Sequence, residues 1–304
     1  PVGPHFMPAV PKSALDEMRR AADDADGGEE ETDAELWERE KKASLRHAKR
    51  IRDNGTFRWS APGKHVLLSF LSDQHVGDHA DYAAMQRDAE LIASTPNCYA
   101  VLGGDGVDNH LKHRGAVLNQ RMRPGDQYRL FEYYMRIFGD RLLAMVSGNH
   151  DDWTGQFAGI DLMSRLARDN RIFYNPSECY IDARVGATNY TIGLRHQFRM
   201  NSSFNQTHAV KQWLRLGVRA FDIGVVRHHH EAAIEETMYR GQPVWVARPG
   251  AYQGQTSYSS ALGYNPATPT CPTFLLRGDR RAIYGWNSVR AAVDCVGALR
   301  EIGV

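Results

Sequence analysis

Short apolar runs alternate along the chain with longer segments whose apolar residues recur every three or four positions. Continuous apolar runs at residues 65–71 and 98–103 predict buried strands, because a strand covered on both faces has no polar side. Residues 81–94 and 126–139 have the apolar spacing of helices, and Asp126 is a plausible N-cap of the second. Further strands are predicted at residues 141–147, 189–195, 222–227, 243–248 and 273–276. This order predicts an α/β fold with its chemistry at the strand ends.

The first 60 residues do not share this rhythm. We expect an N-terminal, charged extension over residues 1–60 and one folded domain over residues 61–304. An acidic stretch at 23–35 is predicted to be disordered, and a basic stretch at 39–52 to form a short amphipathic helix. The cationic face of that helix is either simply solvated or contacts nucleic acid.

Composition and charge exclude few classes of protein. The 304 residues are 42% hydrophobic and 24% charged, which is typical of a globular chain. A net charge of +1 provides no global field for nucleic acid or an anionic membrane, so such a partner would have to meet a local patch. No apolar run approaches the ~20 residues of a membrane span, and no signal-peptide pattern opens the chain. We therefore expect a cytoplasmic protein without a membrane partner; because it begins with Pro1, we expect a fragment or a processed form.

The four cysteines are far apart and form no Cys-x-x-Cys pair. They are Cys98, Cys179, Cys271 and Cys295. Free buried thiols in a reducing compartment are the favoured interpretation, and disulfides or zinc ligation are the alternative.

Polar side chains follow five of the predicted strands. The segments are SDQHVGD, GGDGVDNH, SGNHDDW, GLRHQF and VVRHHHE, and they supply Asp73, His75, Asp105, Asn149, His150, Asp151, His196, His228 and His230. Carboxylates, amides and imidazoles are ligands for divalent ions of intermediate hardness. Each residue alone has an ordinary alternative as a packed histidine, a helix cap or a turn residue. Their occurrence together at five strand ends predicts a metal centre.

Three consecutive histidines, His228 to His230, raise a further question. On a strand, alternate side chains point to opposite faces, so His228 and His230 would share a face, about 7 Å apart along the chain. Such a pair can share one metal ion or serve two adjacent ions.

The ordered motifs D-x-H, G-D-x-x-D, G-N-H-D, a single His and H-x-H resemble those of the calcineurin-like metallophosphoesterase superfamily, over roughly residues 64–280. The resemblance implies a two-sheet β-sandwich flanked by helices, a four-layer αββα arrangement with metals at the strand ends. It implies two divalent ions; Mn²⁺ is expected, and Fe²⁺, Zn²⁺ or Ni²⁺ would also suit these ligands.

The resemblance also implies a division of the ligands between the two ions. The first would be held by Asp73, His75 and His230, the second by Asn149, His196 and His228, with Asp105 bridging them.

His150 matches the family's non-ligand histidine, which contacts the phosphoryl group and helps the leaving oxygen to depart. Asp151 is expected to orient that imidazole, and Asp108 and Asn109 are expected behind the ligands or in a turn. The family usually has Gly before the last histidine pair where this chain has Arg227. The Arg227 cation is a candidate contact for substrate phosphate.

A dinuclear site of this kind predicts phosphoester hydrolysis, because two close divalent ions lower the pKa of a shared water and neutralise phosphate oxygens. Three segments favour nucleic acid as the substrate. SDQHVGD is similar to the opening motif of the double-strand-break-repair nucleases, residues 109–129 gather cations, and residues 248–265 are similar to phage-type members of the superfamily. The candidate substrate contacts are Lys112, Arg114, Arg121, Arg123 and Arg227.

The expected function is therefore a phosphodiesterase, specifically a nuclease acting on DNA. All three segments also fit surface loops around any phosphatase site, so a phosphomonoesterase acting on nucleotides or proteins is the alternative. GDGVDNH lacks the Arg-Gly of the Ser/Thr protein phosphatases, which disfavours that branch. A catalytically silent scaffold is a third possibility, although such a protein is expected to lose ligands.

Overall fold

A computed structural model describes residues 32–77, 79–111, 120, 122–202, 204–254 and 268–301. Its contacts divide the chain into two units, residues 1–52 and 53–304. Helix α2 (Asp33–Asn54) accounts for the described part of the first unit and includes the helix predicted at 39–52. Its start is capped by Thr32, whose backbone N–H donates to Glu35 Oε2 at 2.9 Å. Most of the acidic stretch at 23–35 lies outside the described residues.

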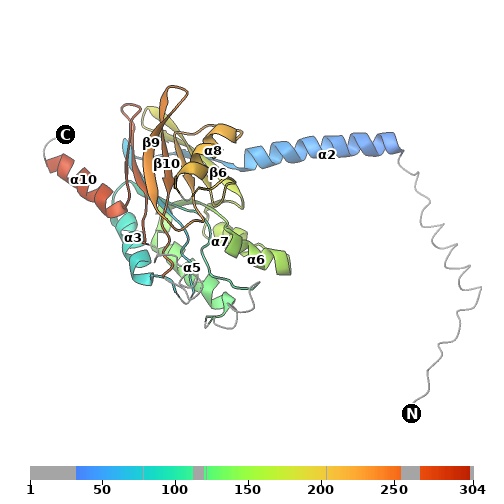
Figure 1. Cartoon of the computed structure of the whole chain (residues 1–304), viewed down its shortest axis with the longest axis horizontal. Coiled ribbons are helices and arrows are strands. Elements are labelled where there is room, and N and C mark those ends of the chain that lie inside the picture. Colours follow the sequence, from blue (N-terminus) through green and yellow to red (C-terminus); the bar gives the residue numbers. More distant parts are fainter. Residues whose placement is uncertain are drawn as a thin grey trace, which may run out of the picture. The chain divides into compact units, whose positions relative to one another are not determined.

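In the described part of the second unit the strands form two six-stranded sheets (Figure 1). The first sheet has the order β12 (Ile283–Trp286), β11 (Thr273–Arg277), β2 (His65–Leu71), β3 (Cys98–Leu102), β4 (Leu142–Val146) and β5 (Phe173–Asn175). The second has the order β1 (Thr56–Ser60), β6 (Glu178–Val185), β7 (Thr188–Arg195), β8 (Ile223–Val226), β10 (Gln242–Arg248) and β9 (Ala233–Tyr239). Because β2 to β5 are parallel neighbours, as are β7, β8 and β10, their carboxyl ends meet at one edge of each sheet.

Strand β2 shows why its sequence is apolar throughout. Val66, Leu68 and Phe70 point into the core between the two sheets, whereas Leu67 and Leu71 point into the core beneath the helices. Both faces of the strand are therefore covered, as the uninterrupted apolar run predicts.

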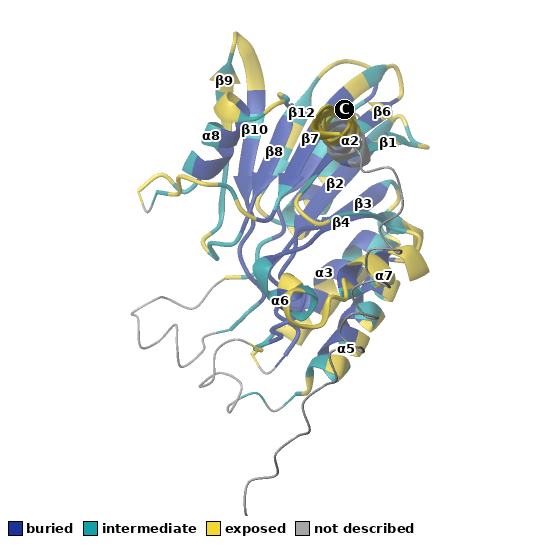
Figure 2. Ribbon diagram, turned by 90° about the vertical axis from the view of Figure 1, so that its right-hand side faces the viewer, coloured by how far each residue is buried: buried dark blue, intermediate teal, exposed yellow. Residues whose placement is uncertain are grey.

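Helices cover the outer faces of the sandwich (Figure 2). On the first sheet lie α3 (Tyr82–Ser94), α5 (Pro124–Ile137), α7 (Leu162–Asp169) and α10 (Val289–Glu301). On the second sheet α8 (His208–Leu216) inserts Trp213, which is fully buried. The predicted fold, two sheets flanked by helices, is confirmed.

The seven predicted strands are present within one residue at each end, but two boundaries differ. Helix α5 begins at Pro124, with Arg123 rather than Asp126 in the N-cap position, because proline suits the first helical turn. The domain boundary expected at residue 60 is wrong, since β1 pairs in parallel with β6 and the ring of Trp59 packs edge-on against Tyr99 at 4.7 Å.

The cysteines are free thiols, of which Cys98, Cys179 and Cys271 are buried and Cys295 is exposed. Burial raises the pKa of the Cys98 thiol to about 11, so this thiol is not reactive at neutral pH. Among the described residues, no helix combines the length and the apolar character that a bilayer crossing requires.

Candidate metal centre

The loops that follow β2 and β3 run side by side beyond the ends of their strands. Asp73 N–H donates to Gly104 O at 3.0 Å, and His75 N–H donates to Asp105 O at 3.0 Å. These bonds continue the parallel pairing of β2 with β3 into the loops. They bring Asp73 and His75, from the first loop, next to Asp105, from the second.

Four of the predicted ligands have a left-handed backbone conformation. The φ angles are 53° at Asp73, 45° at His75, 50° at Asp105 and 73° at His228. Side chains other than glycine rarely adopt this region, although Asp, Asn and His do so more often than other residues. Backbone strain of this kind concentrates at functional sites, where the surrounding structure maintains it.

The structure gathers the predicted ligands into groups with metal-binding geometry. Within each group, one potential ligand atom per residue lies within 4.8 Å of those of the other members. The groups are Asp73 with His75 and His230, Asp105 with His196 and His228, and His75 with Asp105 and His150. The first group contains the three side chains expected at the first ion, and the second contains His196 and His228, expected at the second ion, with Asp105. His75 Nε2 lies 3.8 Å from Asp105 Oδ2, between the two groups.

Neighbouring acceptors fix the orientation of two of these imidazoles. His196 Nδ1 donates to Gly103 O at 2.9 Å, because a carbonyl can only accept, and this leaves Nε2 for the centre, 3.1 Å from Asp105 Oδ2. His75 Nδ1 lies 3.2 Å from Asp108 Oδ1. Acceptors behind a histidine ligand are the usual means of setting its tautomer. Asp108 therefore lies behind the ligands, and the second Asp of G-D-x-x-D was its signal in the sequence.

Several buried side-chain atoms of the predicted ligands lack hydrogen-bond partners among the described residues. They include Asp73 Oδ1, His75 Nε2, Asn149 Oδ1 and His228 Nδ1. Buried polar atoms without partners are costly and rare in folded proteins. Oxygen and imidazole nitrogen atoms left open in this way fit a divalent cation.

The Asp105 carboxylate and burial set the pKa values of the imidazoles in the centre. Burial alone would lower the pKa of His196, but the Asp105 carboxylate outweighs it and raises that pKa to about 9. Burial lowers the pKa values of His228 and His230, which therefore present neutral rings at neutral pH. An incoming cation would therefore have to displace a proton from His196 but not from His228 or His230.

His150 is held firmly beside the centre. Its backbone N–H donates to Asp105 Oδ1 at 2.9 Å, and its Nδ1 donates to Asp108 O at 2.6 Å. The ring packs against Trp153, with centroids 4.2 Å apart and the ring planes tilted by 32°. Burial and the neighbouring His75 lower the pKa of His150 to about 4. Sequence reasoning missed Trp153, which follows His150 by three residues on helix α6 (Asn149–Ala158).

Contrary to the prediction, Asp151 does not orient the imidazole of His150. Its carboxylate accepts the backbone N–H of Gly106 at 3.0 Å and of Gly148 at 2.8 Å. Asp151 therefore joins the loop after β3 to the start of α6, while the carbonyl of Asp108 orients His150. Helix geometry explains the difference, because an acidic residue in the first turn satisfies the free N–H groups there.

The three consecutive histidines lie in the loop after β8, not on a strand. His228 and His230 belong to different groups, one with His196 and the other with Asp73. His229 is half-buried and packs edge-on against His228, at 5.0 Å between centroids. Of the two arrangements that the sequence left open, the geometry favours one imidazole for each of two ions.

The predicted substrate contacts are only partly placed. Lys112, Arg114 and Arg121 lie outside the described residues, as does 255–265 of the later segment. Arg123 is exposed at the start of α5. The prediction for Arg227 is wrong, because its side chain is fully buried between the sheets and is not presented to a substrate.

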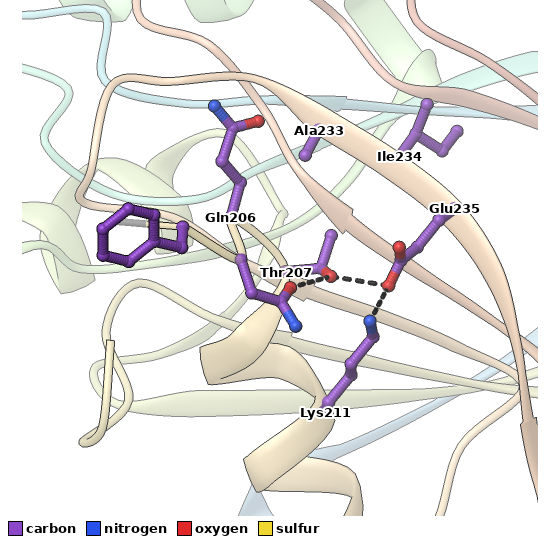
Figure 3. Close-up of a pocket in the computed structure, with 8 residues that line it drawn as sticks. Gln206, Thr207, Lys211, Ala233, Ile234 and Glu235 are labelled. Carbon is purple, nitrogen blue, oxygen red and sulfur yellow. Dashed lines mark hydrogen bonds and ion pairs between the residues drawn. The ribbon is translucent and has the colours of Figure 1, made fainter. Parts of the chain in front are cut away.

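A hollow of about 440 Å³ lies elsewhere, where the loop after β7 meets the start of β9 (Figure 3). Its charged groups bond to one another: Lys211 pairs with Glu235, and Thr207 Oγ1 donates to Glu235 Oε1 at 2.6 Å. With these groups satisfied, the hollow offers a ligand little that water does not. Its bonds instead join the segment that follows His196 to the strand that follows His230.

No protein-family model and no curated protein matches this sequence. Solved structures similar to this chain include TT1561 of Thermus thermophilus, which is 13% identical over 73% of this chain and 98% of that one, with a TM-score of 0.42. A metallophosphoesterase from Sphaerobacter thermophilus is 14% identical over 79% of this chain and 95% of that one, with a TM-score of 0.36. GAP50, the anchor in the inner membrane complex of Plasmodium, is 10% identical over 74% and 88%, with a TM-score of 0.40. Likeness at this level carries no argument about activity, which has to be argued from the side chains.

Proposed function

We propose that the protein is a phosphoester hydrolase that depends on two divalent metal ions, of which Mn²⁺ is the expected one. The observation that carries the proposal is the set of buried ligand atoms without partners around Asp105, contributed by segments far apart in the sequence. Asp73, His75 and His230 would hold one ion, and Asn149, His196 and His228 the other, with Asp105 between them. When bound, the ions would supply Lewis-acid activation of water and neutralise phosphate charge.

Among these residues, the geometry of His150 best suits contact with the phosphoryl group of a substrate. Its Nδ1 is committed to Asp108 O, so Nε2 is the nitrogen that remains for substrate. In the neutral ring Nε2 carries a lone pair and accepts a proton, and once protonated it can return that proton to a leaving oxygen. Packing against Trp153 and the bond from the His150 backbone N–H to Asp105 keep the ring in position for this exchange.

For the substrate we propose a phosphodiester, with nucleic acid as the natural class. The cation-rich insertion over residues 109–129 supports this, since both of its described ends lie at the centre. Asn109 Nδ2 donates to His150 O at 2.7 Å, and Gln127 Oε1 accepts the N–H of Asn109 at 2.8 Å. His110 lies beside His150, with ring centroids 5.3 Å apart. The cations that follow His110 in the sequence would then grip the phosphates that flank the cleaved one.

The test compares the Mn²⁺-loaded protein on a generic phosphodiester, a generic phosphomonoester, and single- and double-stranded DNA. The variants are His228→Ala, His230→Ala and His150→Ala, with His229→Ala as the matched control from the same loop. We expect each of the first three to lose at least about a hundredfold in activity, and the control to stay within about threefold. Equal losses in His229→Ala and His228→Ala would contradict the ligand assignment.

The choice of substrate decides the finer proposal. Faster cleavage of the diester than of the monoester, together with cutting of DNA, is expected for a nuclease. Faster cleavage of the monoester without DNA cutting would indicate a phosphomonoesterase. Metal binding without turnover of any of these substrates would instead indicate a scaffold that has kept the ligands.

A further inference from the structure

Arg227 occupies an unusual position directly behind the candidate metal centre. It follows the last residue of β8, and its backbone N–H donates to His196 O at 3.0 Å. Ile223 and Val225 point into the core between the sheets, so the alternation of the strand sends Arg227 the same way. Its side chain is 0% exposed, at the edge of the sandwich where the ligand-bearing loops begin.

The guanidinium has no acceptor there. Its Nε and both terminal nitrogens lack hydrogen-bond partners among the described residues. The group fills the space left by Gly103, where any side chain would overlap it. A guanidinium stays protonated at neutral pH, so Arg227 carries its positive charge in a place where an unpaired charge is costly.

Burial alone does not explain why the Arg227 guanidinium lacks hydrogen-bond partners, because the side chain of Arg248 is also buried and has them. Arg248 is 2% exposed, and it donates to Glu231 Oε2 at 3.0 Å and to Asn201 Oδ1 at 3.2 Å. The two arginines differ in what surrounds them. Arg227 instead lies within the influence of the buried Asp73 carboxylate of the centre, without a hydrogen bond to it.

We propose that Arg227 is a positioning residue that acts as a built-in counter-charge for the metal centre, and that it lowers the affinity of the centre for divalent cations. This inference rests on the proposed metal-binding function. Before an ion binds, the guanidinium offsets part of the mutual repulsion of the buried carboxylates. After an ion binds, it would repel that ion through the buried interior, where charges are poorly screened. The residue thus favours release and exchange of the ions over permanent capture.

The charge is tested by substitutions with extended side chains that keep or remove it. Arg227→Met removes the charge, Arg227→Gln removes it but keeps a polar end, and Arg227→Lys keeps it. Mn²⁺ affinity is measured by titration calorimetry, and folding is checked by circular dichroism. We expect Met and Gln to tighten Mn²⁺ binding by about tenfold or more, and Lys to stay within about threefold of the native chain. Arg248→Met is the comparison at a buried arginine that has partners; because Arg248 joins the loops that follow His196 and His230, unchanged or weaker Mn²⁺ binding is expected from it.

The outcomes separate this inference from the proposed function. Failure of the native chain to bind Mn²⁺ would overturn both. Native binding with unchanged or weaker affinity in a folded Arg227→Met or Arg227→Gln variant would overturn the counter-charge alone. If neither neutral variant folds, Arg227→Lys decides: native-like affinity supports a role of the charge, and loss of folding shows that Arg227 only fills space.

Discussion

Asp73, His75, Asp105 and His228 show how single residues prepare the centre before any ion arrives. Each has a positive φ angle, a conformation that costs roughly 1–2 kcal/mol for an L-residue. The bonds from Asp73 N–H to Gly104 O and from His75 N–H to Asp105 O hold the first three in place. The fold therefore bears the cost of orienting these ligands, and the centre does not have to be reorganised by the cation.

Gly148 is the residue at which this arrangement is most easily disturbed. A Cβ atom there would lie 2.1 Å from Asp105 Oδ1 and 2.4 Å from Asp105 N, and neither the backbone nor the buried carboxylate can move away freely. We expect Gly148→Ala to displace Asp105, to lower the free energy of unfolding by about 1–3 kcal/mol and to abolish Mn²⁺ binding. Chemical denaturation and calorimetry would measure both effects.

Gly155→Ala is the control, because it lies in the same helix and its Cβ would only touch Ile160 O at 3.6 Å. That substitution should leave Mn²⁺ affinity unchanged and slightly stabilise the protein, since alanine favours the helix more than glycine does. Native-like metal binding in Gly148→Ala would show that Asp105 is not held as tightly as the structure indicates.

We expect His196 to release a proton when a metal ion binds. In the metal-free protein its pKa is raised to about 9, above the ordinary value of 6.5, so the ring carries an extra proton at pH 7. This protonation stabilises the metal-free fold fully below pH 6.5, and the contribution is lost as the pH rises through about 9. A metal ion needs the Nε2 lone pair, so binding at pH 7 should release about one proton from His196.

Calorimetry in two buffers of different ionisation enthalpy measures this proton directly. His228 and His230 should contribute none, because their pKa values are lowered by burial and their rings are already neutral. A binding enthalpy that is the same in both buffers would rule out a protonated His196.

At the scale of elements, the loops that carry the ligands are pinned to one another away from the metals. Arg248, at the end of β10, bonds to Asn201 in the loop after His196 and to Glu231 just after His230. A second link joins Thr207 and Lys211 to Glu235 at the start of β9 (Figure 3). These partly buried polar contacts join the segment that follows His196 to the segment that follows His230.

The contacts of strand β1 lead to a prediction about the residue at which the folded unit begins. A chain that begins at residue 53 keeps β1, its parallel pairing with β6 and the stacking of Phe57 on Phe173 at 5.3 Å. A chain that begins at residue 62 loses all of these and exposes the edge of β6. We expect the first to melt within about 2 °C of the full chain and the second at least about 5 °C lower, as measured by circular dichroism. Equal melting temperatures would return the boundary to residue 60.

For the whole molecule, periodicity and motif order predicted most of the layers, and the departures have physical causes. The buried strands were found because both of their faces are covered. Strands β6 and β9 were missed because their apolar residues are interrupted by charges such as Asp182 and Glu235, which face partly solvated surfaces. The strand ends were informative because parallel neighbours bring their carboxyl ends to one edge.

The inner layer of the site was less accessible to sequence reasoning. Which acceptor orients His150 depends on backbone geometry: the sequence predicted the adjacent Asp151, whereas the fold brings the carbonyl of Asp108 to the ring. The burial of Arg227 depends likewise on the alternation of β8 and on the space left by Gly103. Motif spacing predicted the types and order of the candidate ligands, but contacts across loops had to come from the structure.

The last prediction concerns the stability of the molecule as a whole. Without a cation the second unit contains buried polar atoms that lack partners among the described residues, and a cation that binds only the folded state would satisfy them. At a Mn²⁺ concentration about a hundred times the dissociation constant, one site adds about 2.7 kcal/mol to the free energy of unfolding, and for a domain of this size that raises the melting temperature by roughly 5–10 °C. Calorimetric scans with Mn²⁺ and with a chelator should show this difference, and His228→Ala should reduce it while His229→Ala should not. The same melting temperature in Mn²⁺ and in chelator would mean that these side chains converge for a reason other than metal binding.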